Sequence, residues 1–317
     1  MVLGIVFAVI VSILFAVYAV PRKFSKQNVI LYTMWMGIAY FIGTIILIFI
    51  LWGLRIEEPE NLLNPWHLLT VLRGFVWLLG MAAYNSAIDK IGLTRFNQWK
   101  NIQGPVGSLL ILFVLADVVG TKILWLLLGT TVMFASALMF QITTDEEKEN
   151  RAVGEKNAKA GIALALFSGV CFGVTALLNS VVTRPAIVGD TFTYSQLLYH
   201  SASLVVFSVI VYVMFGDRGN ESSTAGQRFK DIFKVDGKTW LPVMAGGMFL
   251  TATLLTIHSY RMIPNSVAWS IMQLNVFWTV LIGQLVFKEI NCRRHRLRLS
   301  LGVLTAVVAC VFLFCAI

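Results

Sequence analysis

The sequence predicts an all-α integral membrane protein of ten transmembrane helices, arranged as two inverted repeats of five helices each. The first observation is composition, because 58% of the residues are hydrophobic and only 13% are charged. About a quarter of the residues in a soluble domain are charged, and the mean hydropathy of this chain is +0.79. The second is that long apolar stretches recur along the whole chain. The third is that its two halves carry matching residues at a near-constant spacing.

A helix needs roughly 20 mainly apolar residues to cross a bilayer. The first of the apolar stretches has no basic residues before it and runs directly into Pro21, so it is interpreted as a retained helix and not as a cleaved signal peptide. In chain order, spans 1 to 10 are residues 3–20, 31–53, 67–88, 93–115, 121–141, 160–180, 192–215, 241–260, 265–287 and 299–316.

The basic residues predict the orientation of these spans. Of the 25 Lys and Arg residues, 19 are counted in connections that follow odd-numbered spans and five in connections that follow even-numbered ones. Cytoplasmic connections carry an excess of basic residues. We therefore expect a multi-pass protein of the cell membrane, with the odd-numbered connections in the cytoplasm and both termini outside. The same distribution accounts for the net charge of +9 without a nucleic-acid partner.

The two halves of the chain match in order and spacing. Gly4 and Phe15 recur as Gly161 and Phe172 at a shift of 157 residues. The segment around span 4, from Ile91 to Asp117, corresponds to Ile263–Glu289 around span 9 at a shift of 172. Because five spans is an odd number, the second half must cross the membrane in the opposite orientation. Inverted repeats of this kind are typical of secondary transporters, whose substrate site lies between the halves.

The boundary between the repeats is a polar, mixed-charge segment. We expect residues 1–142 to form the first repeat, residues 143–159 a cytoplasmic linker and residues 160–317 the second repeat. Neither repeat can enclose a site alone, so the three segments are treated as one structural unit.

Span 4 carries a polar face inside the membrane. Asn97, Lys100, Asn101, Gly104 and Ser108 fall on one side of a helix. Such a face packs on protein or lines a water-filled cavity. Lys100 is expected to line a cavity, where it would bind substrate or pair with a carboxylate. The alternative is that its side chain extends to the membrane interface.

Span 9 carries a comparable face, in which Gln273 corresponds to Asn101 and Asn275 to Gln103. Amides both donate and accept hydrogen bonds, which suits ligands rich in hydroxyl groups. The alternative is that they only join helices to each other. Tryptophans deep in the spans could pack against a sugar ring or serve only as packing. The candidate substrate-binding residues are Asn97, Lys100, Asn101, Gln103, Trp77, Trp269, Gln273 and Asn275.

Candidates for ion coupling are few, because no Asp or Glu lies in the middle of a span. His200 and His258 titrate in the right range when unperturbed, although a lone histidine in a membrane is often only structural. Glu289 at the end of span 9 is a third candidate. Protons are the expected coupling ion, and the sequence leaves the ion open.

The sequence does not indicate an enzyme. It has no H-E-x-x-H, G-x-S-x-G or Walker-type motif, so no catalytic residue, metal or cofactor is predicted. Three of the four cysteines lie within spans and are interpreted as packing residues.

A non-transporting receptor would not explain two matched halves. The expected partners are a small-molecule substrate and the bilayer. One chain can enclose a site, and both a monomer and a homodimer remain open.

Two segments resemble a known group of transporters. The stretch PNSVAWSIMQLNVFWTVLIGQLVFKE, Pro264–Glu289, is similar to the penultimate repeat helix of the drug/metabolite transporter superfamily in its ten-helix, EamA-like form. Ser12–Lys23 resembles the first helix of the glucose/ribose porters and rhamnose–proton symporters through Val20, Pro21 and Lys23, although Phe15-Ala16 replaces the usual tryptophan-glycine pair.

The resemblance implies sugar uptake by proton symport. The leading prediction is a secondary active transporter of a monosaccharide or related metabolite that works by alternating access. Export of amino acids or of small anionic or amphipathic metabolites is the alternative, because the same scaffold supports both.

Overall fold

The computed structural model describes residues 1–25, 27–91, 99–139, 155–189, 192–216, 224–285 and 292–317. Over these residues the protein is helical, and eight helical segments are long and apolar enough to cross a membrane. The elements that form them are α1 (Val2–Val17) with α2 (Val20–Phe24), α3 (Val29–Gly53), α4 (His67–Ile91), α7 (Lys122–Met139), α9 (Glu155–Val182), α11 (Tyr194–Phe215), α13 (Trp240–Met262) and α16 (Cys292–Cys315). These segments correspond to eight of the ten stretches that the sequence predicts.

The two remaining stretches, spans 4 and 9, are interrupted. Span 9 consists of two short helices, α14 (Asn265–Met272) and α15 (Asn275–Leu285), separated by a turn at Gln273 and Leu274. Span 4 contains α6 (Gln103–Leu115), which follows a turn at Asn101 and Ile102. The structure therefore differs from the continuous helices expected at 93–115 and 265–287.

The two turns have the same backbone hydrogen bonds. The Ile102 N–H donates to the Trp99 carbonyl at 3.4 Å, and the Leu274 N–H donates to the Ile271 carbonyl at 3.0 Å. Both bonds reach back three residues instead of the four of an α-helix, which tightens the chain locally. In span 4, Pro105 follows in the first turn of α6, where its missing N–H has no helical partner to lose.

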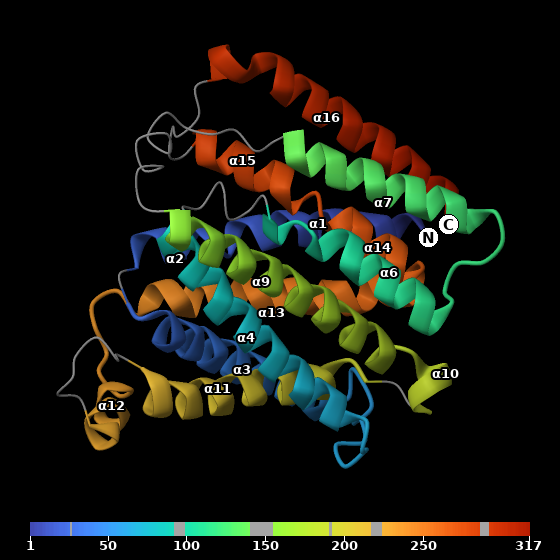
Figure 1. Cartoon of the computed structure of the whole chain (residues 1–317). Coiled ribbons are helices and arrows are strands. Elements are labelled where there is room, and N and C mark those ends of the chain that lie inside the picture. The colour runs from blue at the N-terminus through green and yellow to red at the C-terminus, as the bar shows by residue number, and fades with distance from the viewer. Residues whose placement is uncertain (26, 92–98, 140–154, 190–191, 217–223, 286–291) are drawn as a thin grey trace.

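The long helices pack in pairs around the interrupted ones (Figure 1). In these pairs α4 lies against α9, α13 against α1, α3 against α11, and α7 against α16. Helix α6 packs on α9 and α14, and α15 packs on α1. Two short helices, α10 (Pro185–Val188) and α12 (Ala225–Asp231), lie in the connections.

Apolar side chains cover both the interior and the outer surface. One buried cluster contains Ile111, Trp269 and Leu313, and a second contains Tyr40 and Trp77. Many large apolar side chains are also exposed, such as Phe49, Phe113 and Val311. An apolar exterior of this extent is expected of helices in contact with lipid, where the backbone polar groups are satisfied within each helix.

The two chain termini lie at the same end of the helix bundle (Figure 1). The Lys122 ammonium, at the start of α7, donates to the carbonyl of the C-terminal residue Ile317 at 2.6 Å. Near the N-terminus, the Ser259 hydroxyl at the end of α13 donates to the Gly4 carbonyl at 2.9 Å. The connections that follow even-numbered spans are therefore at the end that holds both termini.

Candidate substrate cavity

A cavity of about 80 Å³ lies among the helices and borders both buried clusters. At roughly 11 to 15 Å³ per water by this measure, it has room for about six water molecules. It is therefore large enough for one small solute. The described lining residues are Phe15, Tyr18, Arg73, Trp77, Lys100, Gln103, Phe172, Thr175, Ala176, Asn179, Phe249, Thr253, Thr256, Tyr260, Trp269 and Asn275.

Aromatic rings form much of the cavity wall. The Trp77 ring lies 5.0 Å from the Phe249 ring, centroid to centroid. On another side the Trp269 indole N–H donates to the Gln103 carbonyl at 3.1 Å. Gly107 allows this contact, because a Cβ at that position would collide with the indole of Trp269. Trp77 and Trp269 are thus held as flat walls, an arrangement that can stack on a sugar ring or on another apolar face.

Polar side chains of spans 4 and 9 lie against each other. The Gln103 side chain donates to the Gln273 side chain at 3.0 Å, and Gln273 donates in turn to the Trp269 carbonyl at 3.2 Å. Gly104 permits this approach, because a Cβ there would lie 2.9 Å from Cγ of Gln273. Asn275 also lines the cavity.

Beside the main cavity is a second space of about 10 Å³, large enough for about one water. Asn101 and Gln273 line it together with Thr130. The Asn101 amide nitrogen is buried and has no hydrogen-bond partner among the described residues. Asn101 and Gln273 thus border this smaller space and not the main cavity.

Other polar residues of the two faces join helices. The Ser270 hydroxyl lies 2.6 Å from that of Ser108 and 2.9 Å from that of Thr130. These three hydroxyls connect α14 to α6 and α7. At these positions the helix-joining alternative applies.

Lys100 lines the main cavity instead of reaching the membrane interface. Its ammonium nitrogen lies 5.3 Å from the centroid of the Tyr84 ring and 5.6 Å from that of Phe172. Cations at this distance over a ring face are attracted by its electrons. This geometry favours the cavity interpretation of Lys100 over the interfacial one.

Arg73 is a cavity residue that the sequence analysis missed. The charge count assigned it to the connection after span 2, but it lies in the second turn of α4 and is only 7% exposed. Its guanidinium donates to the side-chain oxygen of Asn179 at 2.7 Å. The available signal was its position six residues inside the apolar stretch that begins at His67. When Arg73 is excluded, the excess of basic residues in the connections after odd-numbered spans becomes larger.

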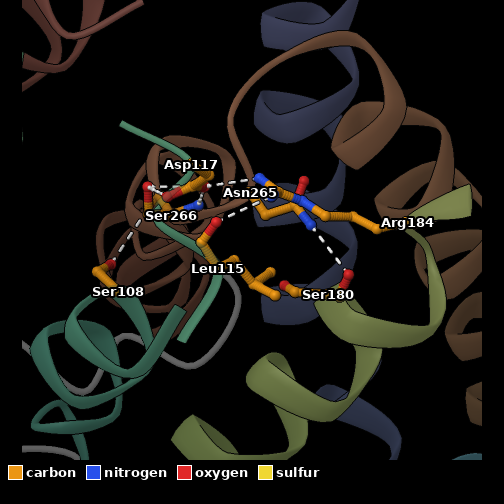
Figure 2. A network of polar contacts seen from close by, with 7 residues as sticks. All are labelled: Ser108, Leu115, Asp117, Ser180, Arg184, Asn265 and Ser266. Atoms are coloured by element: carbon orange, nitrogen blue, oxygen red, sulfur yellow. Dashed lines mark hydrogen bonds and ion pairs between the residues drawn. The ribbon is translucent and has the colours of Figure 1, made fainter. Parts of the chain in front are cut away.

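A polar cluster joins the two halves near the far end of α6 (Figure 2). The Asp117 carboxylate accepts hydrogen bonds from the Ser266 N–H at 2.8 Å and from its hydroxyl at 2.9 Å, at the start of α14. Arg184, after α9, lies 3.9 Å from Asp117 and donates to the Leu115 carbonyl at 3.1 Å. Ala116 turns the chain toward α14 with a left-handed conformation, φ 45°.

This cluster lies at the opposite end of α6 from Gln103. About twelve residues separate Gln103, which lines the cavity, from Leu115, which corresponds to about 18 Å along a helix. We refer to Asp117, Arg184 and Ser266 as the α6-end cluster. It occupies the end of α6 that leads into the connection after span 4.

The two coupling candidates that the structure describes, His200 and His258, are not among the described residues of the cavity lining. His200 is buried, with its Nδ1 atom 3.3 Å from the Tyr40 hydroxyl. The His258 ring lies 6.4 Å from that of Phe7. Glu289, like the substrate-binding candidate Asn97, lies outside the described residues.

Membrane-crossing helices around an aromatic and polar cavity define a multi-pass membrane protein that can hold a small polar solute. Residues 33–316 match the sugar transport protein family. The chain belongs to this family of membrane transporters of sugar-like solutes. A comparison with curated proteins finds no match.

Among solved structures, 25 chains match this one. One is a crystal structure with a TM-score of 0.66 and 13% identity, aligned over 97% of each chain. At this level of identity the likeness concerns the fold alone.

Proposed function

We propose that the protein is a secondary active transporter that moves a monosaccharide or a related metabolite by alternating access, with protons as the coupling ion. The main support is the cavity, because residues from both halves of the chain line it. Trp77 and Gln103 come from the first half, and Trp269 and Asn275 come from the second. A site shared between halves is the arrangement that alternating access requires.

The proposal includes ten spans in two inverted repeats, placed in the drug/metabolite transporter superfamily. The interruptions support it, because Ile102 and Leu274 differ by 172 positions, the shift of the sequence repeat. The packing also supports it. Under the repeat α4 corresponds to α13 and α9 to α1, and the α4–α9 pair is matched by the α13–α1 pair. Likewise α11 packs on α4 as α3 packs on α13.

In this proposal the interrupted spans are where substrate binding and conformational change meet. Turns in the middle of a span expose backbone groups that an unbroken helix would satisfy, and transporters place such turns at their substrate sites. The Gln103–Gln273 bond joins the two turns directly, and solute hydroxyls would compete for the Gln103 amide, which lines the cavity. The α6-end cluster would close the outer side in one state and separate in the other.

The proposed orientation follows the charge count, with both termini outside and odd-numbered connections in the cytoplasm. His200, His258 and Glu289 are proposed as coupling candidates. His200 has one ring nitrogen against the Tyr40 hydroxyl, and its other ring nitrogen is buried with no partner among the described residues. A buried imidazole with a vacant nitrogen can take up a proton if water reaches it.

The test is uptake by the purified protein in proteoliposomes with an imposed proton gradient. A labelled monosaccharide should accumulate above its external concentration, and a protonophore should abolish this accumulation. Gln273→Ala and Gln103→Ala should each lower uptake about tenfold or more. Gln227→Ala, at an exposed position on α12, is the matched control and should behave as wild type.

Two results would contradict the proposal. Binding without accumulation would indicate a receptor. Transport of amino acids in place of every sugar-like solute would favour the alternative function, amino-acid export. For coupling, His200→Gln should remove the response to the proton gradient while leaving exchange of labelled for unlabelled solute intact.

A further inference from the structure

Two cationic side chains line the same cavity inside the membrane. Arg73 comes from α4 in span 3, and Lys100 comes from the interrupted part of span 4. Charged side chains are rare at membrane depth because moving them out of water is unfavourable, and those that occur are generally paired or functional. The charged groups around these two residues therefore indicate the charge of the solute that the cavity binds.

Neither cation is paired with a carboxylate among the described residues. The described lining of the cavity contains no Asp or Glu. Arg73 has one hydrogen-bond acceptor, the neutral side chain of Asn179 at 2.7 Å, whereas a guanidinium carries five N–H donors. Among the described residues, the Lys100 ammonium faces two rings, those of Tyr84 and Phe172. Ring faces compensate a buried charge less fully than an anion does.

The geometry of Arg73 suits one class of anion. The bond to Asn179 fixes the guanidinium plane against α9 and leaves further N–H donors without a partner among the described residues. A planar guanidinium binds a carboxylate through two parallel charge-assisted hydrogen bonds, which are stronger than the bonds it forms to neutral hydroxyls. Lys100 supplies a second positive charge in the same cavity without geometric restriction.

The remaining lining fits a polyhydroxyl body. Gln103 and Asn275 present amides, and Trp77 and Trp269 present flat apolar faces. A cavity with room for about six waters takes one sugar-sized solute but leaves little for a bulky extra group. This favours a compact carboxylate over a larger phosphate as the anionic group.

We propose that the solute transported through this cavity is a sugar acid, with its carboxylate held by Arg73 and Lys100 and its hydroxyls by Gln103 and Asn275. This inference rests on the proposed transport function and narrows its substrate from sugars in general to aldonates or uronates.

The test compares acidic and neutral sugars in proteoliposomes of the full chain. Labelled D-glucuronate and D-gluconate should exchange across the membrane, and unlabelled D-glucuronate should compete at least about tenfold better than D-glucose. D-Glucose 6-phosphate serves as the phosphate-bearing probe. This comparison uses only the wild-type protein, so it does not depend on the folding of any variant.

Variants of Arg73 and Lys100 then test whether these two cations bind the carboxylate. Arg73→Gln and Lys100→Gln should each lower uptake of the sugar acid about 10- to 100-fold, as expected when one member of a buried charge pair is removed. Arg73→Lys, which keeps the charge and loses the planar fork, should recover only part of the uptake. Arg55→Gln, at an exposed position in the connection between α3 and α4, is the matched control and should behave as wild type.

The outcomes separate this inference from the proposed function. If neutral sugars accumulate, glucuronate does not compete and Arg73→Gln is silent, the sugar-acid inference is wrong while sugar transport stands. Preference for the sugar phosphate would also overturn the carboxylate assignment. If no sugar or sugar acid moves, both the inference and the proposed function fail.

Discussion

At the scale of single residues, the cavity depends on close approaches that only glycine permits. Gly169 on α9 faces the turn that precedes α6, where an added Cβ would lie 2.7 Å from the Lys100 carbonyl oxygen. Gly173, one helical turn further on, would place a Cβ 3.0 Å from the Gly107 amide nitrogen. Because the opposing atoms belong to the backbone, they cannot rotate away. The position of Lys100 in the cavity therefore depends on the absence of side chains at Gly169 and Gly173 on the facing surface of α9.

The first prediction concerns Gly169→Ala. The added methyl group should push α9 away from the turn that carries Lys100, and overpacking of this kind costs about 1–3 kcal/mol. The midpoint of thermal unfolding in detergent should fall, and substrate affinity should weaken with it. Gly247→Ala on α13 is the control, because its Cβ would meet nothing within 4 Å. That variant should be neutral or slightly stabilised, since alanine favours helix over glycine. Equal unfolding midpoints for the two variants would contradict this account.

The residues of the site were predictable from the sequence to different degrees. Lys100 was found because helical spacing places it on a polar face, and a polar face in a membrane needs a partner. Gln103 and Asn275 were found because they correspond to each other at the repeat shift of 172. Arg73 was missed because Thr70 is its only polar neighbour at helical spacing, and because it lies near the start of its span, where a basic residue fits a connection equally well. Only the packing of α4 against α9 reveals that it is buried.

At the scale of elements, α14 is a short helix whose start is fixed from outside itself. Its first N–H groups have no partner within the helix, and Asp117 accepts the one from Ser266 at 2.8 Å. The carboxylate also lies at the positive end of the helix dipole. A residue of the first half thereby holds the wall-forming helix of the second half, which couples the position of Trp269 to the α6-end cluster.

The second prediction concerns Asp117→Asn. The substitution removes the charge and one of the accepting oxygens, so α14 should lose about 0.5–2 kcal/mol of capping stabilisation. The unfolding midpoint should fall, and the exchange rate and apparent affinity should change together if the cluster sets the balance between states. Asp231→Asn is the control, because its ion pair is with Lys234, which follows the end of α12 and has a 78% exposed side chain. Exposed pairs contribute little. A wild-type midpoint and wild-type kinetics in Asp117→Asn would argue against a role for the cluster.

The elements themselves were predicted well where they are continuous. Ranges such as 31–53 and 192–215 differ from α3 and α11 by about two residues, because an apolar stretch with polar ends has one stable form in a bilayer. The interruptions at Asn101–Ile102 and Gln273–Leu274 were not predicted. Residues around the second turn include no proline or glycine, so the turn depends on packing between α14, α6 and α1, which hydropathy does not record.

At the scale of the whole molecule, the described connections lie at two ends of the helix bundle. The connection between α3 and α4 carries few basic residues, whereas α12 and its flanks carry several. Since basic segments are retained in the cytoplasm, the α12 end should face the cytoplasm, and the end with both termini should face outward. Orientation in turn decides which side the α6-end cluster closes.

The third prediction tests this orientation by cysteine labelling in a variant whose four native cysteines are replaced. Glu58→Cys, exposed between α3 and α4, should react with a membrane-impermeant maleimide in intact cells. Lys230→Cys, exposed on α12, should react only after the membrane is permeabilised. Each variant is first checked for wild-type uptake, so that labelling reports the native fold. The reversed pattern would invert the orientation and place the α6-end cluster at the cytoplasmic side. In that case the same cluster would close the inner side of the cavity, and the sugar acid would leave the Arg73–Lys100 site through the other end.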